Sequence, residues 1–198
     1  WLNCSRPSSN RSTSGRRHLV MANLPGVVNT VAGYQGTVCE PKGWREMLRI
    51  IRDEVDADAI AAAQAREAYE GAVAKLVARL RDKDFELLID LLLSRCGWAR
   101  LAKLGGVTEG IDIEVENAAA NEIAFVQVKS TASQAVLDDY VSRFKNQRDR
   151  YDRMIFAVHT AKGKLTPPDG QSVQIWADGR IAQLVVRCGL GDWVAARL

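Results

Sequence analysis

Three residues with complementary chemistry lie in two segments that have the pattern of neighbouring strands. Asp112 occurs in GVTEGIDIEV, and Gln127 and Lys129 end the apolar run IAFVQVK. Side chains of a strand alternate between its two faces, so Asp112 shares a face with Glu114, and Gln127 shares one with Lys129. A carboxylate, an amide and an ammonium can therefore converge on one surface of a small sheet, beside a divalent cation and a phosphodiester.

Hydrolysis of a phosphodiester needs a hard cation held by oxygen ligands, and positive charge near the developing phosphorane. Asp112 is the first candidate ligand. The amide oxygen of Gln127 and the main-chain carbonyl of Val128 can add two more, because Mg²⁺ keeps several waters and accepts few protein groups. Lys129 would orient the attacking water and neutralise charge. Glu86, in the helical run DFELLIDLLLSRCGW, could hold a metal-bound water.

Other interpretations of these polar residues stay open. An Asp and a Lys on adjacent strands often form only a cross-strand ion pair. Glu114 is either a ligand for a second ion or a solvated strand residue, and Asp90 is expected to be a solvated helix acid. His159 ends the apolar segment MIFAVH. We expect it to be a buried strand-end histidine satisfied by a hydrogen bond, and we leave it out of the site.

The first half of the chain has helical periodicity. Apolar spacing predicts one helix over 43–55 and a second over 58–80, capped by Asp56 or Asp58. A third helix carries Glu86 and ends at Gly97. A helical N-terminal extension therefore precedes the helix that carries the candidate acid.

The second half of the chain changes to the periodicity of strands. Strands are expected at about 98–104, 111–117 and 123–129, joined by polar or Gly-rich turns, which would form an antiparallel meander. A helix over 133–147 follows, capped at residue 133. The strands MIFAVH and VQIW come next, and then a helical tail interrupted at two glycines. The predicted class is α/β, with the order helix, three-strand antiparallel meander, helix, strand.

Composition bounds the class of protein. With 198 residues and 47% hydrophobic content, the chain suits one domain plus an appendage. We expect a soluble, cytoplasmic protein with no membrane segment, because no apolar run approaches ~20 residues and no secretory signal is visible. Residues 1–22 are expected to be a disordered tail or a non-native leader. This tail holds four arginines and no acid before residue 21, so the net charge of +3 is no argument for nucleic acid.

The polar residues resemble the PD-(D/E)xK nuclease superfamily, also called restriction-endonuclease-like, and within it the Mrr-like branch. The resemblance covers roughly residues 82–160. In that branch the second acid of the motif is often Gln, as in QVK here, and GxxxGIDI and the helical FE are similar as well. The Pro of the superfamily's name is absent, since Gly110 and Ile111 precede Asp112.

The resemblance implies roles for individual residues. Asp112 would be the metal ligand, Gln127 and Lys129 the rest of the core motif, and Glu86 the helix acid. The cofactor would be Mg²⁺, with Mn²⁺ as an alternative. A helical N-terminal region over 23–81 would precede a restriction-endonuclease-like nuclease domain over 82–198.

The expected activity is that of a metal-dependent endonuclease on double-stranded DNA, of the restriction or defence type. A junction-resolving or repair nuclease, and a catalytically idle nuclease-like binding domain, are the alternatives. Arg143, Lys145 and Arg148 either contact phosphates or form a solvated helix face. A homodimer or larger assembly is expected, because cutting two strands needs two sites.

Overall fold

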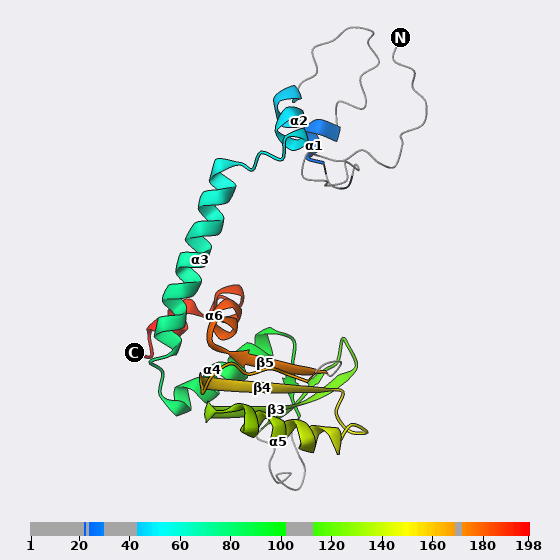
Figure 1. Ribbon diagram of the computed structural model, residues 1–198, viewed down its shortest axis with the longest axis vertical. Coiled ribbons are helices and arrows are strands. Elements are labelled where there is room, and N and C mark those ends of the chain that lie inside the picture. Colours follow the sequence, from blue (N-terminus) through cyan, green and yellow to red (C-terminus); the bar gives the residue numbers. More distant parts are fainter. Residues whose placement is uncertain (1–21, 23, 30–42, 102–112, 169–171) are drawn as a thin grey trace. The chain divides into compact units, whose positions relative to one another are not determined.

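The computed structural model describes residues 22, 24–29, 43–101, 113–168 and 172–198 (Figure 1). Contacts divide the chain into two compact units, residues 1–65 and 66–198. Asp112, the first candidate ligand, lies outside the described residues. Within the described part, no helix is long and apolar enough to cross a membrane.

The first unit contains helices α1 (Gly26–Asn29) and α2 (Trp44–Ile51) and the start of α3 (Ala57–Val77). The helices predicted over 43–55 and 58–80 are thus confirmed as α2 and α3, with slightly shorter bounds. Asp56 caps α3, because its Oδ1 accepts a hydrogen bond of 2.9 Å from the amide of Asp58.

The second unit contains the end of α3 and all the described strands. Its elements are α4 (Asp82–Arg95), β1 (Ala99–Arg100), β2 (Ile113–Asn117), β3 (Glu122–Ala132), α5 (Gln134–Lys145), β4 (Arg153–Ala161), β5 (Val173–Ala177), α6 (Asp178–Arg187) and α7 (Gly191–Ala195). Gly97 follows α4 with a φ of +85°, a conformation that glycine adopts without strain.

The strands form one mixed sheet in the order β1-β2-β3-β4-β5. The first three pair antiparallel, as the predicted meander requires, whereas β3 to β4 and β4 to β5 are parallel. A parallel pair needs a crossover connection, and α5 provides it between β3 and β4. The predicted order of helix, meander, helix and strand is therefore confirmed, and the fold is mixed α/β.

The central strands β3 and β4 are buried on both faces of the sheet. Ala124, Val126 and Val128 of β3 pack into one core with α4 and α6, and Phe125 packs into a second core with α5. Figure 1 shows α5 lying along the sheet on the side opposite α4. A strand covered on both faces is a continuous apolar run in sequence, and this explains IAFVQV.

Three local predictions differ from the structure or are refined by it. β1 has only two described residues, against the predicted 98–104. The last long helix begins at Asp178, ahead of the apolar stripe from Ile181, because an acidic residue suits the first turn of a helix. Ser133 stands at the N-cap of α5, but its side chain makes no capping hydrogen bond.

His159 and the half-buried cysteines serve the packing of this unit. The ring nitrogen Nε2 of His159 lies 3.0 Å from the carbonyl oxygen of Val77, and its ring stands edge-on to Phe85. The predicted hydrogen bond of this histidine is confirmed, on a side chain that is half-buried. Burial, together with the neighbouring Cys188, raises the pKa of Cys96 to about 11, so this thiol stays protonated near neutral pH.

Candidate functional site

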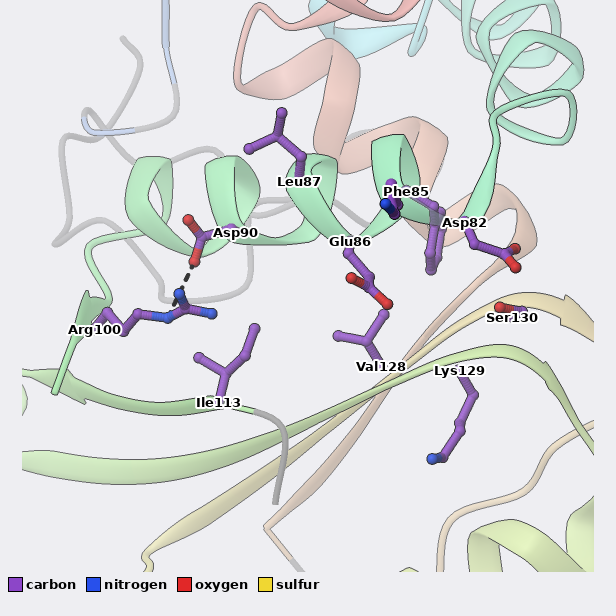
Figure 2. A pocket seen from close by; sticks show the side chains of 11 residues that line it. Asp82, Phe85, Glu86, Leu87, Asp90, Arg100, Ile113, Val128, Lys129 and Ser130 are labelled. Carbon is purple, nitrogen blue, oxygen red and sulfur yellow. Dashed lines mark ion pairs between the residues drawn. The ribbon is translucent and has the colours of Figure 1, made fainter. Parts of the chain in front are cut away.

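A cavity of about 760 Å³ opens between α4 and the adjoining ends of β2 and β3 (Figure 2). Glu86 of α4, Ile113 of β2, and Val128, Lys129 and Ser130 of β3 belong to its lining. Three of the predicted site residues, Glu86, Val128 and Lys129, therefore border one cavity.

The residues of QVK lie where β3 extends past the described part of its antiparallel partner. The last described pair of the β2–β3 ladder joins Ile113 to Val126, so Gln127 is the next residue of β3. On its other side β3 remains paired with β4, through Gln127 with Phe156, and Lys129 with Val158. The parallel ladder therefore fixes the backbone of the motif from one side, and the cavity borders it from the other.

The alternation of β3 sends the predicted residues to different sides of the sheet. Figure 2 shows Glu86 directed from α4 toward Val128, whereas Lys129 projects from the strand away from Glu86. Val128 belongs to the core under α4. Gln127 and Lys129 share the opposite face, the one that α5 covers. Glu86 and Lys129 thus approach the cavity from different directions.

Gln127 is fully buried, with 0% of its surface exposed. Its amide Nε2 donates a long hydrogen bond of 3.4 Å to the carbonyl oxygen of Val128. The sequence predicts that Gln127 and Lys129 share a surface, and here α5 covers that surface at Gln127 and leaves Lys129 half-exposed. A crossover helix must pack on one face of the sheet, and this packing accounts for the burial of Gln127.

Asp90 and Glu86, two acids of α4 that line the cavity, have different surroundings. Asp90, predicted to be a solvated helix acid, lies 3.7 Å from Arg100 in an ion pair, with its side chain 43% exposed (Figure 2). The carboxylate of Glu86 is exposed in the cavity. In the described part of the chain, no three His, Cys, Asp or Glu side chains group as a metal site. Any such site would therefore depend on main-chain and amide oxygens, or on residues outside that part.

Glu114 has a role that the sequence did not indicate. It is buried on the α5 side of β2, opposite Phe125, and accepts hydrogen bonds from the hydroxyl of Tyr151 and from Arg150, the latter at 3.1 Å. Burial, and then Glu114, raises the pKa of Tyr151. Glu114 is therefore an internal anion held by donors more than thirty residues away, a pairing that only the tertiary fold creates.

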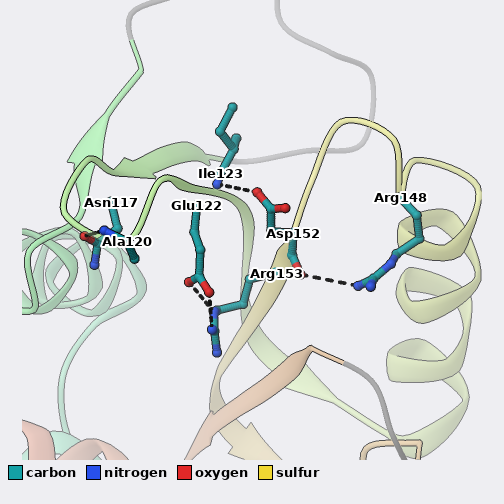
Figure 3. Close-up of polar contacts among 7 residues, drawn as sticks. All are labelled: Asn117, Ala120, Glu122, Ile123, Arg148, Asp152 and Arg153. Atoms are coloured by element: carbon teal, nitrogen blue, oxygen red, sulfur yellow. Dashed lines mark hydrogen bonds and ion pairs between the residues drawn. The ribbon is translucent and has the colours of Figure 1, made fainter.

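The basic residues after the motif also make internal contacts. Arg143 pairs with Asp139 at 2.9 Å, and the guanidinium of Arg148 lies over the ring of Phe144. Figure 3 shows Arg148 donating to the main-chain oxygen of Asp152, at 3.3 Å. Lys145 is exposed at the last residue of α5. The described lining of the cavity includes none of these three predicted nucleic-acid contacts.

A second polar cluster joins the start of β3 to the start of β4 (Figure 3). Arg153 donates two hydrogen bonds to Glu122, at 2.7 and 3.0 Å, and this lowers the pKa of the Glu122 carboxyl. The carboxylate of Asp152 accepts a bond of 2.9 Å from the amide of Ile123. These contacts align the start of β4 with the start of β3.

Comparison with known proteins gives one structural likeness. No protein-family model matches the sequence, and no curated protein matches it. Among solved structures, the chain is similar to the DNA modification-dependent restriction endonuclease AspBHI, with 12% sequence identity and a TM-score of 0.43. The match covers 66% of this chain and 41% of that one, so this chain spans less than half the length of the matched structure.

Proposed function

We propose that this chain is a metal-dependent endonuclease that hydrolyses DNA phosphodiester bonds, of the restriction or defence type. The observation that carries the proposal is that Glu86, Val128 and Lys129 border one cavity, at the point where β3 extends beyond the described part of β2. The proposal also requires Asp112, which lies outside the described residues. An antiparallel ladder continued by one pair would set residue 112 opposite Gln127.

The donor set at this point of β3 suits Mg²⁺. The amide nitrogen of Gln127 lies 3.4 Å from the Val128 carbonyl oxygen, and rotation of the amide group would put its oxygen in the same place. Neighbouring ligands of octahedral Mg²⁺ stand about 3 Å apart. The amide oxygen and the carbonyl therefore match the spacing of two adjacent ligands, and Asp112 would be the charged third. Bound there, the cation would polarise a phosphate oxygen and acidify a water.

The side chains around the cavity would divide the remaining work. Lys129 would orient the attacking water and neutralise charge that develops on the phosphate. Glu86, exposed on the α4 side, would accept a hydrogen bond from a water on that side of the cavity. Val128 and Phe85, which pack into the cavity wall, would exclude bulk water from the reacting atoms.

The proposed substrate is double-stranded DNA, and the proposed setting is the cytoplasm. Arg143, Lys145 and Arg148 would contact phosphates outside the cavity, and the internal contacts of Arg143 and Arg148 would fix the position of two of those charges. A homodimer or larger assembly would bring two sites to the two strands. A junction-resolving or repair nuclease would use the same residues on a branched or damaged duplex.

Nicking of a supercoiled plasmid tests the proposal. The protein should convert the plasmid to nicked and linear forms with Mg²⁺ or Mn²⁺ and not with a chelator. Lys129→Ala and Asp112→Ala should each lower the rate by about 100-fold, because each removes a group that stabilises transition-state charge. Lys75→Ala, an exposed lysine of α3 away from the cavity, is the matched control and should nick like the parent.

Two results would contradict the proposal. Absence of nicking by the parent protein with either metal would favour an idle nuclease-like domain that only binds. Equal nicking by the parent and both active-site variants would show that the activity comes from a contaminant or from another site. Thermal melts of each variant would separate loss of chemistry from loss of folding.

A further inference from the structure

Lys129 is a half-buried cation of β3 that lies against an aromatic ring. It follows Val128, which is only 9% exposed, and it is itself half-buried. Among the described residues no carboxylate forms an ion pair with it. Its ammonium instead lies 5.1 Å from the centre of the Tyr140 ring, within the range of a cation–π contact.

The group next to the Lys129 ammonium determines whether its positive charge is neutralised inside the protein or is available to a bound anion. A carboxylate would neutralise the ammonium, as Asp139 does for Arg143 and Glu122 for Arg153. An aromatic ring attracts the cation through its quadrupole and carries no net charge. An ammonium held by a ring therefore keeps a full positive charge for an incoming anion.

Tyr140 is well placed to fix the direction of the Lys129 side chain. Its ring tilts against that of Phe156, which is fully buried, with 5.9 Å between centroids. Phe156 pairs with Gln127 across the parallel ladder. The ring is thus supported by the same strands that carry the motif. Arg143, one turn further along α5, places its guanidinium 5.0 Å from the same ring, so two cations share one aromatic support.

We propose that Tyr140 is a positioning residue that holds the Lys129 ammonium at the cavity by a cation–π contact, with its charge available to an anionic phosphate oxygen. The role toward phosphate rests on the proposed nuclease function. The positioning itself does not, because it is a property of the folded chain.

Nuclear magnetic resonance tests the positioning without any assay of activity. Reductive methylation with ¹³C-formaldehyde labels lysines and keeps their charge, and Lys129→Arg identifies the Lys129 signal by its loss. Ring current from Tyr140 should move this signal upfield of the other lysines. Tyr140→Phe should keep the displaced signal, and Tyr140→Leu should return it to the position of an ordinary lysine.

Val136→Ala is the matched control for packing. Val136 is half-buried on α5 and packs against the same core, but it carries no aromatic ring. Its loss should lower the melting temperature and leave the Lys129 signal displaced. An undisplaced Lys129 signal in the parent, or a displaced one in Tyr140→Leu, would overturn the positioning role.

The nicking assay then tests what the positioning does. Tyr140→Leu should lower kcat about tenfold, whereas Tyr140→Phe should stay within about twofold of the parent. A Tyr140→Leu variant that has lost the displaced signal but nicks like the parent would overturn the role toward phosphate. If the parent does not nick at all, the proposed function fails, and the Lys129 signal still decides whether Tyr140 positions this side chain.

Discussion

A carboxylate buried in a sheet needs donors that replace its hydration, and two described residues donate to Glu114. Its side chain is 7% exposed, and it accepts hydrogen bonds from Tyr151 and Arg150. Tyr151 in turn packs edge-on against Phe125, the residue opposite Glu114. The polar contact therefore joins the start of β4 to β2 across the buried β3, and its loss would leave a charge underneath α5.

Tyr151→Phe tests this contact at the level of one hydroxyl. The variant should unfold with a free energy lower by about 1–3 kcal/mol, because a buried carboxylate loses one donor. Urea unfolding near neutral pH measures the change. Tyr69→Phe, at an exposed tyrosine of α3, is the control for the substitution itself. A Tyr151→Phe curve that coincides with that of the parent would show that Glu114 does not need the Tyr151 hydroxyl.

The same hydroxyl gives the stability a pH dependence of known sign. Burial raises the pKa of Tyr151 above its ordinary value of 10.0. A raised pKa in the folded state contributes stability that is present below the unfolded pKa and is lost as pH rises above it. The parent should therefore lose stability above pH 10.0 more steeply than Tyr151→Phe does.

At the scale of elements, periodicity predicted most of the sheet. The apolar run IAFVQV, the change from helical to strand spacing after Gly97, and the following amphipathic helix were enough to predict the meander and the helix and strand that follow it, but not the parallel pairing of β3 with β4. Burial of Gln127 was not predictable, because an amide in an apolar run has the same alternation pattern whether a helix covers it or not. The partners of Glu114 were also out of reach, since they come from a different segment of the chain.

Because Gln127 is buried, a charge placed at this position tests whether residue 127 binds the proposed cation. Gln127→Glu would place a carboxylate where 0% of the side chain is exposed. In a chelator the variant should be less stable than the parent by about 2 kcal/mol or more, because the charged form is desolvated. With Mn²⁺ much of that stability should return, because a ligand that binds only the folded state stabilises it.

Thermal melts with and without Mn²⁺ measure this difference. Gln183→Glu, at a half-buried glutamine of α6, adds the same charge away from the cavity and should show no metal dependence beyond that of the parent. If Gln127→Glu is destabilised equally in chelator and in Mn²⁺, the proposed ligand role of residue 127 is wrong, whatever the chain does to DNA.

At the scale of the whole molecule, the sequence predicted a helical region followed by an α/β region with a boundary near residue 82. The structure adds that the last turns of α3, and Leu80 just after it, are part of the core that α4 and α6 share with the sheet. Val73, Val77 and Leu80 are at most 5% exposed and pack in the cluster that contains α4. The carbonyl of Val77 also bonds His159 at the end of β4. The larger apolar residues of this helix gather in its last turns, at Val73, Leu76 and Val77, and this is the sequence signal for the buried end.

Two truncated fragments test whether the second unit begins near residue 82 or includes the end of α3. A fragment of residues 66–198 keeps all three apolar side chains, whereas one of residues 82–198 exposes the surface that they cover. Burial of such side chains contributes about 1.5–3 kcal/mol each, so the shorter fragment should unfold at a clearly lower urea concentration or fail to fold. Val73→Ala in the full chain, which should cost part of the same energy, is the internal reference. Equal urea midpoints for the two fragments would mean that the end of α3 covers the core without stabilising it, and that the second unit begins at α4.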